Sequence, residues 1–292
     1  MDSHHPVASI IGFPGLGKTT LPRKVYKSVQ QHFDCAAWVC VSESPNVNQL
    51  LQDIAGQVGL EKMEIIQNLE INLSSFLSTK RYVIVLDDIW HTTAWDALKN
   101  GLPTIFENGS RIILTSRNTE VGVHVGGRSS LFPLSPLDPE TSETLFYKLI
   151  VDGQQNSCKT NYPPELKKIG KQILERCGGV PLAIVLVAGL LKSKERSESV
   201  WQGVLRGIGQ DDDECAKIFS LSYQDLPLNI KPCFLYFGIF PEDHEVQAFD
   251  LINIWAAEGF IRGSRGKEVE EVGDDYLNRL IARNLVQVVQ SW

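Results

Sequence analysis

The sequence predicts an α/β fold: a parallel sheet covered by helices on both faces, followed by two parts made mainly of helices. Short apolar runs alternate with helical patterns as far as about residue 150, which is typical of a parallel sheet. Beyond Gly153 the helical patterns follow one another without strands. At 292 residues the chain is too long for one ordinary core, so we expect two or three domains.

Five strands are expected in the first part, the last of them weaker than the others. They are residues 7–12, 36–41, 82–87, 111–116 and 131–134. Apolar residues recur at three- and four-residue spacing in three segments between the strands, which predicts helices near residues 18–30, 47–58 and 64–78. Asp138 and Pro139 predict a further helix start, because an N-cap acceptor is followed by proline at the first helical position.

The second part begins with a polar, proline-bearing stretch, residues 154–164, which indicates a linker. Helices are then expected near residues 165–177, 181–191, 198–207, 215–223, 228–237, 248–258 and 268–283. The short acidic stretch 209–214 is a second candidate boundary, and residues 285–289 favour a strand. Helices followed by a late β ribbon indicate a winged-helix module.

A glycine-rich stretch, GFPGLGKTT at residues 12–20, lies between the first strand and the first helix. This is the context in which the pattern G-x-x-x-x-G-K-[ST] binds phosphate. Its glycines let several N–H groups converge on one anion, and the helix start adds the positive end of its dipole. We expect Lys18 to reach the β- and γ-phosphates and the Thr19 hydroxyl to bind Mg²⁺. The residues expected to contact the nucleotide are Gly12, Pro14, Gly15, Leu16, Gly17, Lys18, Thr19 and Thr20. The alternative is an ordinary glycine-rich turn with a solvated lysine.

Two acids, Asp87 and Asp88, end the apolar run of residues 82–86. Carboxylates at the end of a buried strand are costly unless a cation meets them. In a phosphate-loop protein that cation is Mg²⁺, so Asp87 is expected to hold the ion or its water. Asp88 would then orient the attacking water. The alternative is that both acids cap the next helix.

Arg117 follows another expected strand that has polar residues at its C-terminal tip. Ligands of open α/β sheets bind outside the carboxyl ends of the strands. Arg117 could therefore reach the γ-phosphate as an internal arginine finger. The alternative is a surface arginine paired with an acid. The expected catalytic set is Lys18, Asp87, Asp88 and Arg117.

Composition argues against several other classes of protein. A net charge of −7 disfavours nucleic-acid binding as the main role. The six cysteines form no C-x-x-C pair, and we expect reduced, buried thiols. The longest apolar stretch, residues 180–191, is too short to span a bilayer, and the N-terminus has no signal-peptide core. We therefore expect a cytoplasmic location.

Together the motifs resemble the nucleotide-binding (NB-ARC) switch of plant intracellular immune receptors, which is related to the apoptotic protease-activating factor. The matching stretches are residues 12–20, 33–42, 85–90, 109–117, 177–183 and 233–243. Residues 33–42 and Trp90 resemble the coiled-coil branch of these receptors rather than the TIR branch. The resemblance implies a nucleotide-binding domain at 1–153, a helical domain at 154–210 and a winged-helix domain at 211–292.

The same resemblance implies how the module works. Its domains close over ADP, and exchange for ATP opens them and permits oligomerisation. By position, Pro181 resembles the residue that packs on the adenine, and Arg117 resembles the γ-phosphate sensor. We expect Leu182 to extend the wall for the adenine; the alternative is that Pro181 only starts a helix and Leu182 only joins the core. The implied partners in a full receptor are a coiled-coil domain, leucine-rich repeats and other receptor protomers.

The sequence departs from the family pattern in several places. Only residues 1–6 precede the first strand, and the chain stops before the His-Asp motif expected on the winged helix, so we expect a truncated or excised module. Pro22 stands where the family usually has alanine, and its missing N–H costs helix stability unless the first turn absorbs it. Our prediction is an ADP/ATP switch with weak ATPase activity at most. The alternatives are a true ATP-dependent enzyme of kinase or motor type, and an interaction scaffold that has lost its nucleotide.

Overall fold

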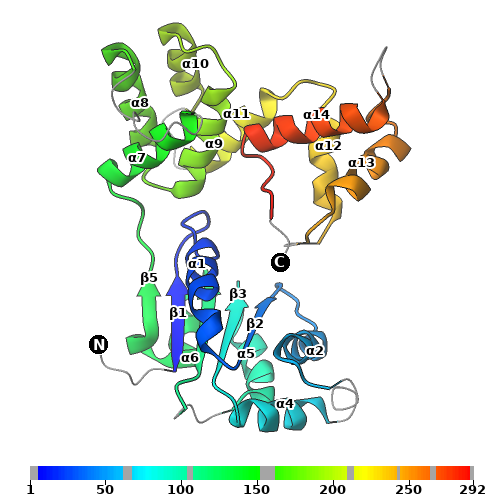
Figure 1. Cartoon of the computed structure of the whole chain (residues 1–292). Helices are drawn as coiled ribbons and strands as arrows, with labels where there is room; N and C mark the ends of the chain where they lie inside the picture. Colours follow the sequence, from blue (N-terminus) through cyan, green and yellow to red (C-terminus); the bar gives the residue numbers. More distant parts are fainter. Residues whose placement is uncertain are drawn as a thin grey trace. The chain divides into compact units, whose positions relative to one another are not determined.

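The computed structural model describes residues 6–61, 68–103, 108–151, 162–208, 214–241, 244–263 and 268–289. The chain divides into two compact units, Met1–Ser135 and Pro136–Trp292, which we describe one at a time (Figure 1).

A parallel sheet of five strands forms the centre of the first unit, as the sequence predicted. The strands are β1 (Val7–Ile11), β2 (Cys35–Cys40), β3 (Tyr82–Asp87), β4 (Arg111–Ser116) and β5 (Leu131–Pro133), in the order β2-β3-β4-β1-β5. Every neighbouring pair is parallel, with Ile11 opposite Ser116 and Cys40 opposite Asp87. The carboxyl ends of β1, β3 and β4 therefore meet at one edge of the sheet.

Helices cover both faces of this sheet. The helices of the first unit are α1 (Thr20–Val29), α2 (Val47–Val58), α4 (Leu69–Ser78), α5 (Thr92–Leu98) and α6 (Thr119–Gly126), with 3₁₀ turns η1 (Gln30–His32), η2 (Lys99–Gly101) and η3 (Arg128–Ser130). On one face Tyr26 of α1 packs against Val83 and Val85 of β3. The alternate residues of β3 join the larger core formed with α2, α4, α5 and α6. Because both faces are covered, β3 is buried along its whole length.

Local signals explain where these helices begin and end. Asn46 caps α2 by accepting a hydrogen bond from the Gln49 N–H, and Gly59 ends the helix in the left-handed conformation. The helix expected at residues 64–78 corresponds to α4, and residues 62–67 lie outside the described part of the chain.

Helices are the only regular secondary structure in the described part of the second unit. They are α7 (Pro139–Ile150), α8 (Pro164–Arg176), α9 (Pro181–Lys192), α10 (Glu198–Ile208), α11 (Glu214–Gln224), α12 (Lys231–Leu235), η4 (Tyr236–Ile239), α13 (Ala248–Ala257) and α14 (Val269–Ala282). One core surrounds α9, which is buried on nearly all sides, and a second surrounds Trp255 of α13. The helix expected over residues 228–237 is observed as α12 followed by the 3₁₀ turn η4.

The division into compact units falls before α7, while the domain boundary expected near residue 153 stays a prediction. Asp138 caps α7 as expected, accepting a hydrogen bond from the Thr141 N–H at 2.9 Å. Phe146 and Tyr147 of this helix then join the core around α9, where Phe146 packs edge-on against Trp201. Helix α7 therefore belongs to the second unit, while the further division into helical and winged-helix domains stays a prediction.

Residues 285–289, expected as a strand, form none in the structure. Asn284 takes a left-handed conformation with φ of 56° after α14, and the Leu285 N–H donates to the Leu280 carbonyl at 3.1 Å. A β-prone segment becomes a strand only where another strand pairs with it, and the described part of the second unit contains none. The prediction of a β ribbon was therefore wrong for residues 285–289.

Candidate functional site

The glycine-rich loop follows β1 and leads into α1 at the carboxyl edge of the sheet. Gly15 and Gly17 have φ of 79° and 92°, a region that residues with a Cβ rarely adopt. At Gly12 a Cβ would lie 3.1 Å from Leu16 and 3.3 Å from Leu134, so the loop packs tightly where it leaves the strand. Leu16 is buried under the loop. These positions therefore need glycine for conformational and steric reasons, which weakens the alternative of an ordinary turn.

Lys18 lies at the start of the helix and is almost fully buried. Its Nζ donates a hydrogen bond to the Phe13 carbonyl at 3.1 Å, so the side chain folds back over the loop instead of extending into solvent. Burial lowers the pKa of this lysine, Asp88 and Asp87 raise it, and Arg117 lowers it. The four expected catalytic residues therefore lie in one electrostatic neighbourhood.

Asp87 joins the loop to the neighbouring strands. This carboxylate is buried, and its Oδ1 accepts hydrogen bonds from Thr19 Oγ1 at 3.1 Å and from Thr115 Oγ1 at 2.6 Å. A hydroxyl and a carboxylate side by side are the hard oxygen donors that Mg²⁺ prefers. Thr19 and Asp87 thus have the chemistry and the proximity for the expected metal site.

Asp88 has an unusual backbone conformation for an aspartate. Its φ is 57°, and its N–H donates to Thr115 Oγ1 at 2.7 Å. Its Oδ2 accepts a hydrogen bond from Arg117 at 2.8 Å. Neither Asp87 nor Asp88 caps helix α5, whose N-cap is His91. The helix-capping alternative for these acids does not hold.

Arg117 contacts two residues, Asp88 and Trp90, which are two positions apart in the sequence. Besides its ion pair with Asp88, its guanidinium lies 4.5 Å from the centroid of the Trp90 ring. Trp38 packs against Tyr26, meeting it edge-on at 5.7 Å, whereas Trp90 forms a platform for the arginine. The alternative for Arg117 was a surface arginine paired with an acid. Arg117 does pair with an acid, but that acid is Asp88, which belongs to the candidate site.

Two further polar residues, Thr115 and Ser116, were not given individual roles from the sequence. Both are buried at the end of β4. The Thr115 hydroxyl donates to Asp87 and accepts from the Asp88 N–H, so it fixes both acids. The Ser116 hydroxyl donates to the Ile89 carbonyl at 2.6 Å and accepts from the Asn118 N–H at 3.0 Å. Their signal in the sequence is a pair of polar residues closing an otherwise apolar strand.

Pro22 lies in the first turn of α1 without breaking it. The hydrogen bonds on either side are present: the Leu21 N–H donates to the Gly17 carbonyl at 3.0 Å and the Arg23 N–H to the Thr19 carbonyl at 3.1 Å. The one bond that proline cannot make is the bond to the Lys18 carbonyl. First-turn N–H groups contribute least to a helix, so the turn absorbs the substitution.

Pro181 and Leu182 begin α9 and lie in the second unit, so their approach to a base held by the first unit stays a prediction. Gly178 and Gly179 have φ of 56° and 72° and end the preceding helix. At Gly179 the Leu137 N–H donates to its carbonyl at 2.8 Å, and any Cβ there would collide with the Leu137 backbone. Leu182 is 38% exposed. Pro181 thus starts a helix at a rigid turn, beside a leucine that is accessible from outside this unit.

The NB-ARC domain family matches residues 1–156, which is more than half of the chain. The chain belongs to the NB-ARC family. In this NB-ARC chain, residues 239–292 also match the winged-helix domain of disease resistance proteins, in agreement with the fold expected for the C-terminal part.

Relatives of the NB-ARC chain are plant resistance proteins. It is 50% identical over 293 aligned positions to the ToMV resistance protein Tm-2(2) of Solanum lycopersicum, covering 99% of this chain and 34% of that protein. It is 41% identical to a putative late blight resistance protein homolog of Solanum demissum, covering 97% of this chain and 22% of the relative. Disease resistance protein RPH8A of Arabidopsis thaliana is 36% identical, with 97% and 32% covered. The chain therefore spans about a third or less of these relatives.

No helix in the described part of the NB-ARC chain is long and apolar enough to cross a membrane.

Proposed function

We propose that this NB-ARC chain is the ADP/ATP-operated switch of a plant immune receptor, with ADP holding it off and ATP with Mg²⁺ turning it on. One observation carries the proposal: a tight glycine loop lies beside Lys18, Asp87, Asp88 and Arg117, whose charges act on one another. Membership in the NB-ARC family supports nucleotide binding in general. The identity of the nucleotide, the metal and the switching are the proposed part.

Each residue has a role that follows from its position. The loop N–H groups and the Lys18 ammonium would hold the phosphates, because a glycine-rich loop at a helix start offers such donors to an anion. Thr19 and Asp87 would hold Mg²⁺ between a hydroxyl and a carboxylate. The bound ion would supply charge neutralisation at the phosphates. Gly12, Pro14, Gly15, Leu16, Gly17 and Thr20 would shape the cradle.

Arg117 is suited to sense the γ-phosphate. It pairs with Asp88 at the site itself, so an additional phosphate would compete with that carboxylate for the same guanidinium. While Arg117 holds Asp88, one carboxylate oxygen of that acid is already engaged and cannot orient the attacking water. Slow hydrolysis is therefore expected, which suits a switch better than the rival ATP-dependent enzyme.

The second unit would complete the switch. Pro181 and Leu182 would pack against the adenine, linking the state of the nucleotide to the helical and winged-helix parts. In the full receptor, a coiled-coil domain, leucine-rich repeats and other protomers would respond to that link. We place this activity in the cytoplasm, and we expect no role for nucleic acid.

The decisive experiment identifies the nucleotide that the purified chain retains. The protein is denatured and the released nucleotide is measured by chromatography and mass spectrometry. We expect ADP at close to one per chain, and none from Lys18→Ala, because the phosphates would then face backbone dipoles alone. Lys24→Ala is the matched control, since Lys24 is an exposed lysine on the same helix.

Three outcomes separate the proposal from its rivals. Equal ADP release from Lys18→Ala and the parent would refute the phosphate cradle. No nucleotide from the parent, and no binding of added ADP or ATP, would favour the interaction scaffold. Turnover of added ATP near the enzyme median of about 10 s⁻¹ would favour the ATP-dependent enzyme.

A further inference from the structure

Strand β2 lies at one end of the sheet, and no described strand pairs with its outer side. In a strand the N–H and C=O groups of one residue point the same way, and those of the next residue point the opposite way. Val41 donates its N–H to Asp87 on β3 at 2.7 Å, so odd-numbered residues face inward. Ala36, Trp38 and Cys40 therefore direct their main-chain groups toward the outer edge. An edge of this kind is a template for pairing with another strand.

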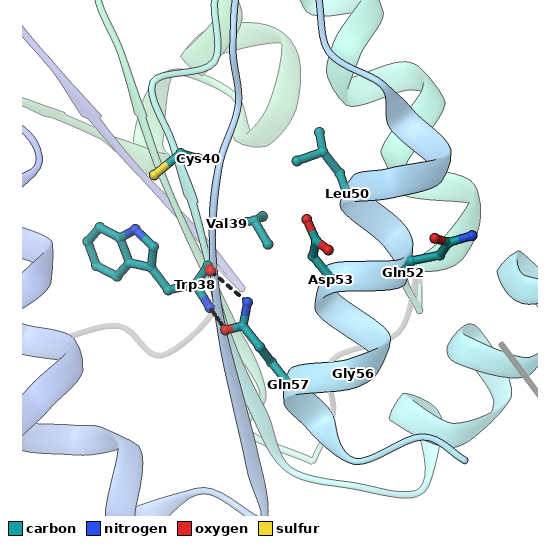
Figure 2. A pocket seen from close by; sticks show the side chains of 8 residues that line it. All are labelled: Trp38, Val39, Cys40, Leu50, Gln52, Asp53, Gly56 and Gln57. Atoms are coloured by element: carbon teal, nitrogen blue, oxygen red, sulfur yellow. Dashed lines mark hydrogen bonds between the residues drawn. The ribbon is translucent and has the colours of Figure 1, made fainter. Parts of the chain in front are cut away.

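A glutamine side chain occupies the middle of that edge. Gln57, in the last turn of α2, accepts a hydrogen bond from the Trp38 N–H at 2.8 Å and donates one to the Trp38 carbonyl at 2.9 Å (Figure 2). A side-chain amide has the same donor and acceptor as a peptide group. Gln57 thus imitates one residue of a neighbouring strand. It is exposed, so it can rotate into solvent.

A groove of about 510 Å³ runs between this edge and α2. Its described lining residues are Trp38, Val39, Cys40, Leu50, Gln52, Asp53, Gly56 and Gln57. In Figure 2 the Asp53 carboxylate lies in the space between helix and strand. Gly56 in a helix interior costs about 1 kcal/mol relative to alanine, yet a Cβ there would meet nothing within 4 Å. No packing contact explains this glycine, and its effect is to widen the groove.

The charge of the groove indicates which kind of segment would fit it. Asp53 carries the only charge among the described lining residues, and its carboxylate accepts a hydrogen bond from Gln49 at 2.9 Å. The sequence of β2, CAAWVC, has no lysine or proline of the kind that blunts exposed edges. Among the described residues, the side chain of Gln57 therefore covers this edge at Trp38, beside a negative charge.

We propose that the outer edge of β2 is a docking strand for an extended segment of another polypeptide, with a basic side chain beside Asp53. In the unbound chain, the Gln57 side chain occupies the position that the incoming backbone would take. Docking exchanges two hydrogen bonds of Gln57 for main-chain hydrogen bonds along the strand, and it places a side chain of the partner over Gly56. It uses no residue of the nucleotide site, so it stands independently of the proposed switch.

The test measures binding of a short peptide to the full 292-residue chain. The probe is a fluorescent, acetylated and amidated peptide Thr-Val-Lys-Val-Thr-Val, with one version carrying glutamate for lysine and one N-methylated at alternate backbone amides. Binding is followed by anisotropy, and protection of the Trp38 amide by NMR hydrogen exchange. We expect the lysine peptide to bind and to protect Trp38, and the N-methylated version to fail, because it cannot donate along the strand.

Variants of the chain sharpen the result. Gln57→Ala removes the competitor, so the lysine peptide should bind roughly threefold to tenfold more tightly. Asp53→Asn should weaken the lysine peptide by about threefold and leave the glutamate peptide unweakened. Gln31→Ala is the matched control, because this exposed glutamine lies off the edge in η1 and should change nothing.

Three results would overturn the proposal. Equal binding of the N-methylated peptide would mean that the backbone does not pair with β2. If no peptide slows hydrogen exchange of the Trp38 amide even in Gln57→Ala, then Gln57 only covers an edge that binds no partner. If Gln57→Ala instead dimerises without binding peptide, as measured by sedimentation, the occupant is a second copy of this chain.

Discussion

Two clusters of charge, one in each unit, combine aspartate, lysine and arginine in different settings. In the first unit Lys18 and Arg117 lie around Asp87 and Asp88, next to a loop with two glycines of positive φ. In the second unit Asp225 bonds to Lys194 and lies 3.8 Å from Arg283. Around this second cluster the backbone is close-packed: any Cβ at Gly189 would collide with the Arg283 carbonyl, and Asn284 donates to the Val185 carbonyl at 2.9 Å.

The difference shows that ion pairing alone does not make a binding site. In the second cluster the charges connect the end of α9, the segment after α11 and the end of α14, so they act as a structural clamp. In the first, buried hydroxyls hold the acids in place, and the adjoining loop contains two glycines of positive φ. The same residue types therefore fix the fold in one unit and, in our proposal, bind a ligand in the other.

The largest expected effect comes from Asp87→Ala, which tests the binding half of this comparison. Loss of the carboxylate should lower Mg²⁺-dependent ATP affinity by about a hundredfold, on the scale of two or more charged hydrogen bonds. ADP affinity without Mg²⁺ should change much less. Titration calorimetry with and without Mg²⁺ measures both values, and equal losses under the two conditions would remove Asp87 from the metal site.

Asp225→Ala tests whether the charged cluster of the second unit stabilises the fold. The pair is about three-quarters buried, with side-chain exposure of 24% for Asp225 and 27% for Lys194. Its loss should destabilise the chain by about 1–2 kcal/mol, between the values for exposed and fully buried pairs. Thermal or urea unfolding monitored by circular dichroism measures this change. Unchanged stability, or a nucleotide affinity that falls with it in saturating Mg²⁺, would contradict the role of a clamp.

Pro181→Ala examines whether the second unit contributes to nucleotide binding at all. If the ring packs on the adenine, ADP affinity should fall by roughly fivefold, or about 1 kcal/mol of lost apolar contact. The melting temperature in saturating ADP should stay nearly unchanged, since alanine is well tolerated at a helix start. Calorimetry and melts on one preparation decide the matter, and equal ADP affinity would mean that α9 does not cover the base.

The smallest effect concerns Trp90. Its ring supports the Arg117 guanidinium, a contact worth about 0.5–1 kcal/mol in exposed settings. Trp90→Ala should therefore reduce the preference for ATP over ADP by about threefold, whereas Trp90→Phe should retain most of it. A competition assay with both nucleotides measures the ratio. If phenylalanine fails to rescue alanine, the aromatic face is not what positions the arginine.

Sequence patterns predicted the five strands well because each is a short apolar run with a turn beside it. The motifs predicted Lys18, Thr19, Asp87, Asp88 and Arg117 as candidates, and the structure brings them together at one edge. Thr115 was missed because a polar residue at a strand tip looks the same whether it binds acids or solvent. The placement of α7 with α9 depends on packing between distant segments, which no local pattern encodes.

Two other misses have equally physical causes. Residues 285–289 have strand propensity, but that propensity is expressed only where a partner strand is available. The bond from Gln57 to Trp38 joins a helix end to a strand edge, and glutamine in a polar helix face carries no signal of such a contact.

The strand order also has a consequence for how the chain folds. Among the described strands, β1 pairs with β4 and β5, both more than a hundred residues later in the sequence. At a synthesis rate of about 5–20 residues per second, the ribosome needs roughly 5–20 s to produce those partners after β1 has been made. During that interval an apolar strand and the glycine loop after it have no sheet to join. The loop is thus synthesised well before the strands that hold it in place, and during that interval the nascent chain exposes apolar surface.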